Sequence, residues 1–214
     1  WDSINEAWAE MRVMTPDILA GGGFASFVDW VKKRCSEFRG AVDSSLLRDD
    51  GFAFIELGKW IERADATARL LDVKYHVLLP SAEDVGGGLD YMQWQQILRA
   101  ANSLRAYRYV YRKPVTAEGV VDFLVLNEKT PRSLKRCYAE IVEAIEDIGA
   151  PLVSQKRVYI RARRSLDELN EETAAGVLSY GLHEWLTETI VETNTLAGDI
   201  GTAYGFTAPV ELQE

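Results

Sequence analysis

The sequence has few of the residues that build most catalytic and metal sites. Its 214 residues include only two histidines and two cysteines. Neither histidine stands in a Glu-x-x-His or His-Glu-x-x-His motif, so the ligand patterns of a di-metal carboxylate bundle and of a zinc site are missing. No nucleophile–base arrangement can be read from these residues either. The sequence therefore predicts no metal and no cofactor, and it favours a protein that is not an enzyme by itself.

Long apolar runs and an excess of positive charge are also missing. No apolar run approaches the roughly 20 residues that span a bilayer, and no basic segment followed by an apolar one marks a secretory leader. The formal net charge is -9, which opposes general binding to nucleic acid or anionic membranes because like charges repel at long range. We therefore expect a cytoplasmic protein without a DNA or membrane partner.

Each of the two cysteines falls on an apolar stripe at helical spacing. Cys35 follows Phe24 and Val31 on one stripe, and Cys137 follows Leu134 on another. A cysteine on such a stripe behaves as a small apolar core residue. We predict two buried, reduced thiols and no disulfide, in keeping with a reducing compartment.

Helical periodicity runs through nearly the whole chain, and no period-2 strand pattern stands against it. A helical segment at "SINEAWAEM" comes first, and the further predicted helices cover residues 23–45, 54–78, 90–104, 116–126, 130–149, 154–169 and 174–204. Predicted helix caps are Asp49 or Asp50, Asp90, Thr116 and Thr130; the last is followed by proline at the first helical position. Pro80 and Gly149 are predicted stops. The fold class is therefore all-α, an antiparallel multi-helix bundle forming one domain over residues 1–214.

The stretch "GKWIERADATARLLDVKYH" places charged residues beside a long apolar seam. The seam residues recur in steps of three and four: Phe54, Leu57, Ile61, Ala64, Ala68, Leu71, Tyr75 and Leu78. Glu62 and Arg63 are adjacent, about 100° apart on the helix, and cannot pair well with each other. Glu62 is expected at the edge of the core, where a carboxylate needs a charged partner. Two interpretations stay open, an ion-pair lattice between helices and a ligand site.

The candidate binding residues are the charged ones on this helix and two arginines of a later basic stretch: Glu62, Arg63, Asp65, Arg69, Asp72, His76, Arg105 and Arg108. Asp65 with Arg69, and Asp72 with His76, have the i, i+4 spacing of helix-stabilising pairs. The stretches "LRAYRYVYRK" and "QKRVYIRARR" are basic within an acidic chain. Their arginines either pair with the surplus carboxylates or bind an anion, such as a phosphorylated ligand, a peptide carboxylate or an acidic partner.

Three segments together resemble the bacterial alpha-E family, an alpha-helical domain with a Glu-Arg motif. They are "RDDGFAFIELGKWIERADATARLLDVKYHVLLP", "LDYMQWQQILRAANSLRAYR" and "FLVLNEKTPRSLKRCY". On this resemblance, Glu62 and Arg63 correspond to the Glu-Arg pair. Family members typically begin with another helix that carries a similar pair, and nothing before Gly23 matches it. The chain is therefore similar to the C-terminal two-thirds of a member.

The resemblance implies partners, namely circularly permuted ATP-grasp proteins and also transglutaminase-like proteins, in peptide or amide-bond metabolism. One hypothesis is a non-catalytic helical partner of an ATP-grasp-type ligase. The alternative is an enzyme subunit of amide formation, with Glu62 as general base and Arg63 or Arg69 holding a carboxylate or phosphate. The lack of a catalytic constellation favours the first.

The amino-terminal segment carries apolar residues that predict self-association. Trp1, Ile4, Trp8 and Met11 would be left bare by the absence of a preceding helix. Contiguous apolar surface of this kind drives association unless something covers it. We expect a homo-oligomer, at least a dimer.

Overall fold

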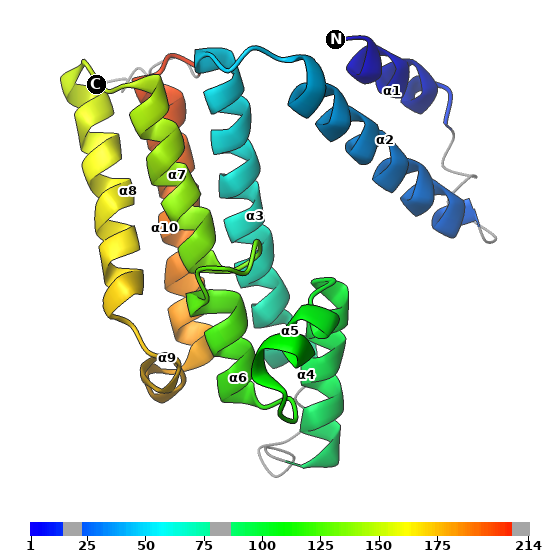
Figure 1. Cartoon of the computed structure of the whole chain (residues 1–214), viewed down its shortest axis with the longest axis vertical. Coiled ribbons are helices and arrows are strands. Elements are labelled where there is room, and N and C mark those ends of the chain that lie inside the picture. Colours follow the sequence, from blue (N-terminus) through cyan, green and yellow to red (C-terminus); the bar gives the residue numbers. More distant parts are fainter. Residues whose placement is uncertain (15–22, 78–86, 207–214) are drawn as a thin grey trace, which may run out of the picture. The chain divides into compact units, whose positions relative to one another are not determined.

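The computed structural model describes residues 1–14, 23–77 and 87–206, with the side chains of 75–77 left out of the description. Over these residues the chain is built of helices and contains no strand (Figure 1), so the all-α prediction is confirmed. The chain divides into two compact units, Trp1–Phe52 and Ala53–Glu214. A single domain over residues 1–214 stays a prediction. No described helix has the length and apolar character needed to cross a bilayer.

Unit 1 is a pair of helices, α1 (Asp2–Arg12) and α2 (Gly23–Ser45), and neither has a buried residue. Polar groups join the two helices. Arg34 on α2 donates from Nε to Oε2 of Glu10 on α1 at 3.0 Å. The indole N–H of Trp30 donates to the same carboxylate at 2.5 Å. The bounds predicted for α2 are confirmed.

The predicted burial of Cys35 is wrong, because its side chain is exposed. Phe24, on the same stripe, is 61% exposed. Two helices share a single interface, so the remaining faces of each helix have nothing of this unit to cover them. Cys137 in unit 2 is fully buried, as predicted, and neither cysteine forms a disulfide.

The longest described helix is α3 (Asp50–Val77). Oδ1 of Asp49 accepts the backbone N–H of Gly51 at 3.0 Å, so this carboxylate caps the start as predicted. The predicted stop at Pro80 and the seam residue Leu78 lie outside the described residues. The side chain of Tyr75 lies outside them as well.

The core line of α3 is rotated from the predicted seam. Leu57, Ala64, Ala68 and Leu71 are buried as expected, whereas Phe54 and Ile61 are only partly buried. Other buried positions are Ala53, Trp60, Thr67 and Lys74, all on the flank that also carries Arg63. The buried face is therefore turned toward Arg63 and away from Glu62.

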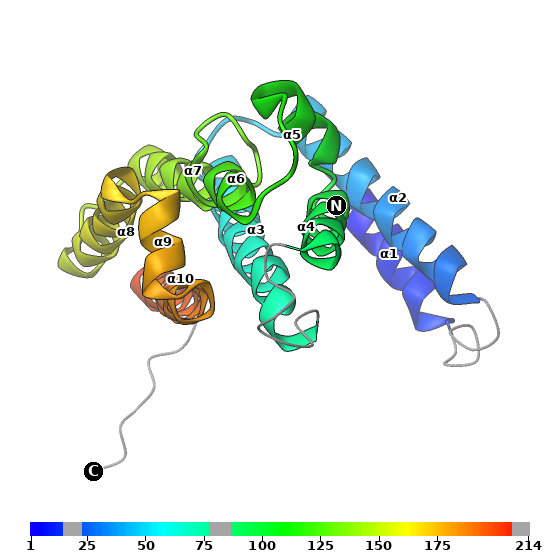
Figure 2. The same cartoon turned by 90° about the horizontal axis from the view of Figure 1, so that it is seen from below.

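Eight further elements complete the described part of unit 2. They are α4 (Gly88–Ala100), α5 (Leu104–Tyr111), α6 (Ala117–Val121), a π-helix (Asp122–Leu126), α7 (Leu134–Ile148), α8 (Val153–Glu171), α9 (Ala174–Tyr180) and α10 (Leu182–Ala203). The long helices α3, α7, α8 and α10 run alongside one another as a bundle (Figure 1). Figure 2 shows α4 beside α3 when the bundle is seen from below. The bundle prediction is confirmed.

Two predicted helix starts are wrong. Helix α7 is capped by Ser133, whose Oγ accepts the backbone N–H of Arg136 at 3.1 Å, and not by Thr130. The Ser133 hydroxyl also donates to the carbonyl of Asn127 at 2.5 Å, a contact that holds the preceding residues in a turn. Helix α4 starts at Gly88, so Asp90 lies inside its first turn and is not the cap. The predicted stop at Gly149 is confirmed by its left-handed φ of 81°.

Three further differences concern continuity. The helix predicted over 90–104 is interrupted, because α4 ends at Ala100 and α5 begins at Leu104. Thr116 caps α6 through the N–H of Gly119 as predicted, but the second half of that helix is π-helical, over Asp122–Leu126. The closing helix predicted over 174–204 is two helices, because Gly181 has a φ of 113°. An L-residue rarely adopts this backbone conformation, so glycine is needed where α9 ends and α10 begins.

Candidate functional site

The two residues of the Glu-Arg pair have different surroundings. Glu62 is exposed and, among the described residues, has no hydrogen-bond or ion-pair partner. Arg63 is half-buried: its Nη1 donates to the carbonyl oxygen of Pro131 at 3.3 Å. The guanidinium carbon also lies 4.6 Å from the ring centroid of Trp60. The expected partly buried position of Glu62 is wrong, because the core line of α3 is turned toward Arg63.

Asp65 and Asp72 of α3 both contact residues of α10. Nε of Arg69 donates to Oδ2 of Asp65 at 2.6 Å, which confirms the predicted pair. Oδ1 of Asp65 accepts from Nδ2 of Asn194 on α10 at 3.2 Å. The side chain of His76, the predicted partner of Asp72, lies outside the described residues.

Asp72 links α3 to α10 through a histidine. Its Oδ1 lies 2.6 Å from Nδ1 of His183, across 111 residues of sequence. This hydrogen bond raises the pKa of His183 above its ordinary value, and the charge of Glu184 adds to the effect. Asp65 and Asp72 therefore fit the interhelical lattice better than an open ligand site.

A buried lysine, which the sequence analysis missed, joins α3 to α4. Lys74 is 2% exposed. Its ammonium donates to Asp90 and, at 2.6 Å, to Oε1 of Gln93. It also lies 5.0 Å from the ring centroid of Trp94, whose buried indole N–H has no acceptor among the described residues. The available signal was its spacing of three from Leu71, which puts it on the buried face.

Helix α5 and its C-cap residue Arg112 present arginines without carboxylate partners among the described residues. Arg105, Arg108 and Arg112 are exposed, and no described carboxylate lies within 4.0 Å of any of them. Nη2 of Arg108 is 3.4 Å from Oε1 of Gln95, a neutral acceptor. Tyr109 between them is 77% exposed. The expectation that arginines pair with surplus carboxylates therefore fails on this helix.

The same expectation is largely met on α8. Arg161 donates from Nε and Nη2 to both oxygens of Glu192, each at 2.6 Å, and from Nη1 to Asp199 at 2.8 Å. These bonds lower the pKa of Glu192. Arg164 pairs with Glu168 one turn away at 2.8 Å. Arg157 is the exception, since it is exposed and has no partner among the described residues.

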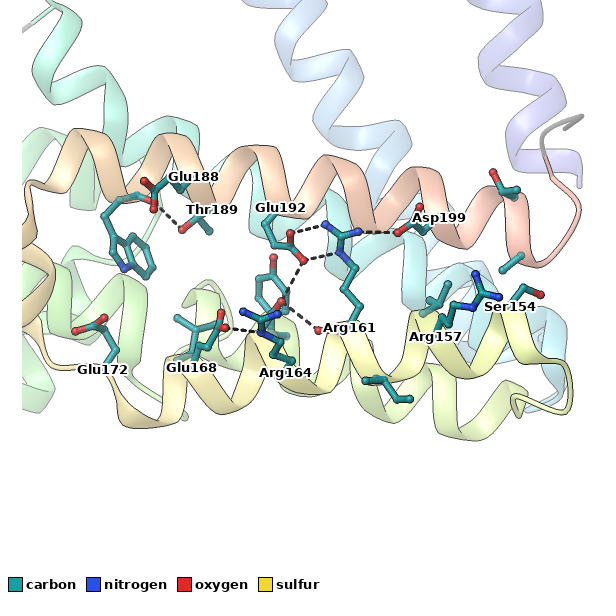
Figure 3. Close-up of a pocket in the computed structure, with 18 residues that line it drawn as sticks. Ser154, Arg157, Arg161, Arg164, Glu168, Glu172, Glu188, Thr189, Glu192 and Asp199 are labelled. Carbon is teal, nitrogen blue, oxygen red and sulfur yellow. Dashed lines mark hydrogen bonds and ion pairs between the residues drawn. The ribbon is translucent and has the colours of Figure 1, made fainter. Parts of the chain in front are cut away.

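A groove of about 1120 Å³ lies between α8 and α10 (Figure 3). Its lining includes arginines from α8 and carboxylates from both helices, with apolar side chains between them. On α10 the lining residues Trp185, Glu188, Glu192 and Asp199 are spaced by three, four and seven, as on one helix face. That spacing was the signal that the sequence analysis overlooked. Among the described residues, no cluster of histidine, cysteine and acidic side chains could hold a metal ion.

These features define the class of protein as an all-α bundle whose longest described helix carries an adjacent glutamate and arginine. Comparison with known families gives the particular family. Residues 1–204 match Alpha-E, described as a predicted alpha-helical domain with a conserved ER motif. The chain belongs to the Alpha-E family, and the resemblance found in its sequence is confirmed. No curated protein and no solved structure matches the chain.

Proposed function

We propose that this Alpha-E chain is a non-catalytic helical binding module that docks on a circularly permuted ATP-grasp-type ligase of peptide or amide-bond metabolism. The observation that carries the proposal is the surface of α5. Three exposed arginines there have no carboxylate within 4.0 Å among the described residues, in a protein whose net charge is -9. An unneutralised cationic surface on an acidic protein suits an acidic partner surface, because complementary potentials favour encounter and fix orientation.

The arrangement of α5 also suits a protein interface. Its inner face is anchored, since Tyr107 is buried against Phe123 at 5.6 Å between ring centroids. The hydroxyl of Tyr111 is bound to Asp122. The outer face adds the exposed Tyr109 to the arginines, and tyrosine and arginine are the residues enriched where interfaces bind most strongly. Because the helix is already formed and anchored, its backbone loses little conformational entropy on docking.

The alternative, an enzyme subunit with Glu62 as general base, has less support. Arg69 is held by Asp65, and Arg63 contacts Trp60 and Pro131, so neither arginine is placed to hold a substrate carboxylate beside Glu62. A transglutaminase-like protein is a second kind of partner for the α5 surface. We place the protein in the cytoplasm, because both of its cysteines are free thiols.

The experiment is co-purification of the full chain with the ATP-grasp-type ligase encoded beside it, with and without nucleotide. The variant R105E/R108E reverses two charges on α5 and should weaken binding at least tenfold. It should also reduce the salt dependence of the affinity. The matched control is R39E/R163E, which reverses two charges at exposed positions of α2 and α8 outside α5. Equal binding by the α5 variant and the parent would overturn the proposal.

A further inference from the structure

We propose that the groove between α8 and α10 binds an extended peptide, with the peptide's carboxylate beside Arg157 and a cationic group beside Trp185. This inference goes beyond docking through α5 and does not depend on it. The groove lies wholly within unit 2. Four properties support it, namely its length, its floor, the difference between its two ends and its net charge.

The length of the groove fits a short extended chain. Its lining on α8 reaches from Ser154 to Glu172 (Figure 3). Between Arg157 and Glu172 a helix rising about 1.5 Å per residue advances roughly 22 Å. An extended peptide spans about 3.3–3.6 Å per residue, so about six to seven residues cover this distance. The volume of about 1120 Å³ is slightly larger than the roughly 300–1,000 Å³ of small-molecule sites.

The middle of the groove is a fixed polar floor. Arg161 lies there with three of its five N–H groups bound to Glu192 and Asp199 (Figure 3). The hydroxyl of Tyr138, another lining residue, is 2.8 Å from that of Thr193. The charged groups of Arg161, Glu192 and Asp199 are already bonded to one another. The middle of the groove can therefore form hydrogen bonds with an uncharged ligand. A peptide backbone, neutral and rich in donors and acceptors, meets this requirement.

The end near the start of α8 is cationic. Arg157 is exposed and has no hydrogen-bond or ion-pair partner among the described residues. The neighbouring Ser154 belongs to the same lining. A guanidinium group binds a carboxylate with two parallel hydrogen bonds, which makes it the usual residue for this role. This end of the groove therefore suits the carboxyl terminus of a peptide.

The opposite end is anionic and aromatic. Glu172 and Glu188 line it together with the half-buried Trp185, and neither carboxylate has a cation within 4.0 Å among the described residues. Glu188 accepts the hydroxyl of Tyr180 at 2.6 Å, which holds its carboxylate in place. An ammonium group can pair with such carboxylates and lie over an indole ring. This end therefore suits an amino terminus or a lysine side chain.

The balance of charge argues against a polyanion. The lining contains the arginines 157, 161 and 164 against the acidic residues 168, 172, 188, 192 and 199. A nucleic acid or polyphosphate lying along the groove would face more carboxylates than arginines. A zwitterionic or cationic peptide would not, because each of its charged ends meets the opposite charge.

The experiment uses the full chain, immobilised, and a pool of hexapeptides with lysine first, alanine last and random residues between. A second pool has an amidated carboxyl end, and a third has acetylalanine in place of the lysine. Retention is measured by mass spectrometry. The parent should retain the free-acid lysine pool about tenfold more than either of the other two. Equal retention of the three pools would overturn the proposal.

Matched variants test the two ends separately. Arg157→Gln should abolish the preference for the free acid while keeping the preference for lysine. Glu188→Gln combined with Trp185→Leu should do the opposite. Arg163→Gln, on α8 but outside the lining, should behave like the parent. Helical content and melting temperature report whether each variant is folded. If folded Arg157→Gln keeps the full preference for the free acid, the assignment of that end is wrong.

Discussion

Arg63 of α3 donates a hydrogen bond to the backbone carbonyl of Pro131, 68 residues further along the chain. The same guanidinium lies over the ring of Trp60. The arginine of the Glu-Arg pair thus fastens α3 to the turn that precedes α7. The glutamate beside it has no such contact, so the two members of the motif should respond differently to substitution.

Glu62→Ala and Arg63→Ala should separate these roles in denaturant unfolding. An exposed carboxylate without a partner contributes little, so Glu62→Ala should cost below about 0.5 kcal/mol in free energy of unfolding. Arg63→Ala removes a charge-assisted hydrogen bond and a cation–π contact, and should cost about 1–2 kcal/mol. Glu62→Gln serves as the isosteric control. A loss of several kcal/mol for both Glu62 variants would mean that this side chain has a charged partner.

Lys74 should be among the most sensitive positions of α3. Replacing the buried ammonium removes its hydrogen bonds to Asp90 and Gln93, so Lys74→Met should cost about 3 kcal/mol in free energy of unfolding. The double variant K74M/D90N should cost less than the sum of its single variants, because the two groups contact each other directly. Additive losses in urea unfolding would show that the two groups are not coupled.

The Asp72–His183 pair should make stability depend on pH near neutrality. The folded pKa of His183 is raised above 6.5, so the pair stabilises the protein fully below the unfolded pKa. That contribution is lost as the pH rises through the folded pKa. The difference in stability between the parent and His183→Gln should therefore shrink from pH 6 to about pH 8.5.

A nuclear magnetic resonance titration of the His183 ring provides the direct measurement. The midpoint should lie above 6.5 in the parent and return toward 6.5 in Asp72→Asn, because the first cause of the shift is the hydrogen bond to Asp72. A midpoint at or below 6.5 in the parent would contradict the pairing.

Helix α1 should mediate self-association. It has no buried residue, and Trp1 and Trp8 are 89% and 54% exposed. Sedimentation over a concentration series should show at least a dimer in the parent, and Trp8→Glu should shift it toward monomer. Val191→Glu, at a 60% exposed position of α10, is the control and should leave the assembly unchanged. A monomeric parent at high concentration would refute this expectation.

What the sequence could predict was mostly local. The bounds of α2 and the Asp65–Arg69 pair depend on residues within a few turns of one helix, where spacing alone decides the geometry. The start of α7 was missed because Ser133 also binds the carbonyl of Asn127, which favours it as cap over Thr130. The break at Gly181 was missed because a single glycine is tolerated inside many helices.

The site contacts that were missed are the distant ones. Asp72 meets His183 across 111 residues, and Arg161 meets Asp199 across 38. No periodicity along one helix says which residue of another helix lies opposite. The buried face of α3 differs from the predicted seam for the same reason, because the neighbouring helices determine which side of an amphipathic helix is covered.

The two cysteines differ in exposure, which makes the protein suitable for selective labelling. Cys35 is exposed in unit 1, whereas Cys137 is fully buried in unit 2, and burial raises the pKa of its thiol to about 12. A maleimide dye should therefore attach to Cys35 alone in the native protein, without mutagenesis. The slow modification of Cys137 would then report how often the interior of unit 2 opens to solvent. One unaltered chain thus offers a site for a fluorescent label in unit 1 and, in unit 2, a thiol whose rate of modification measures unfolding.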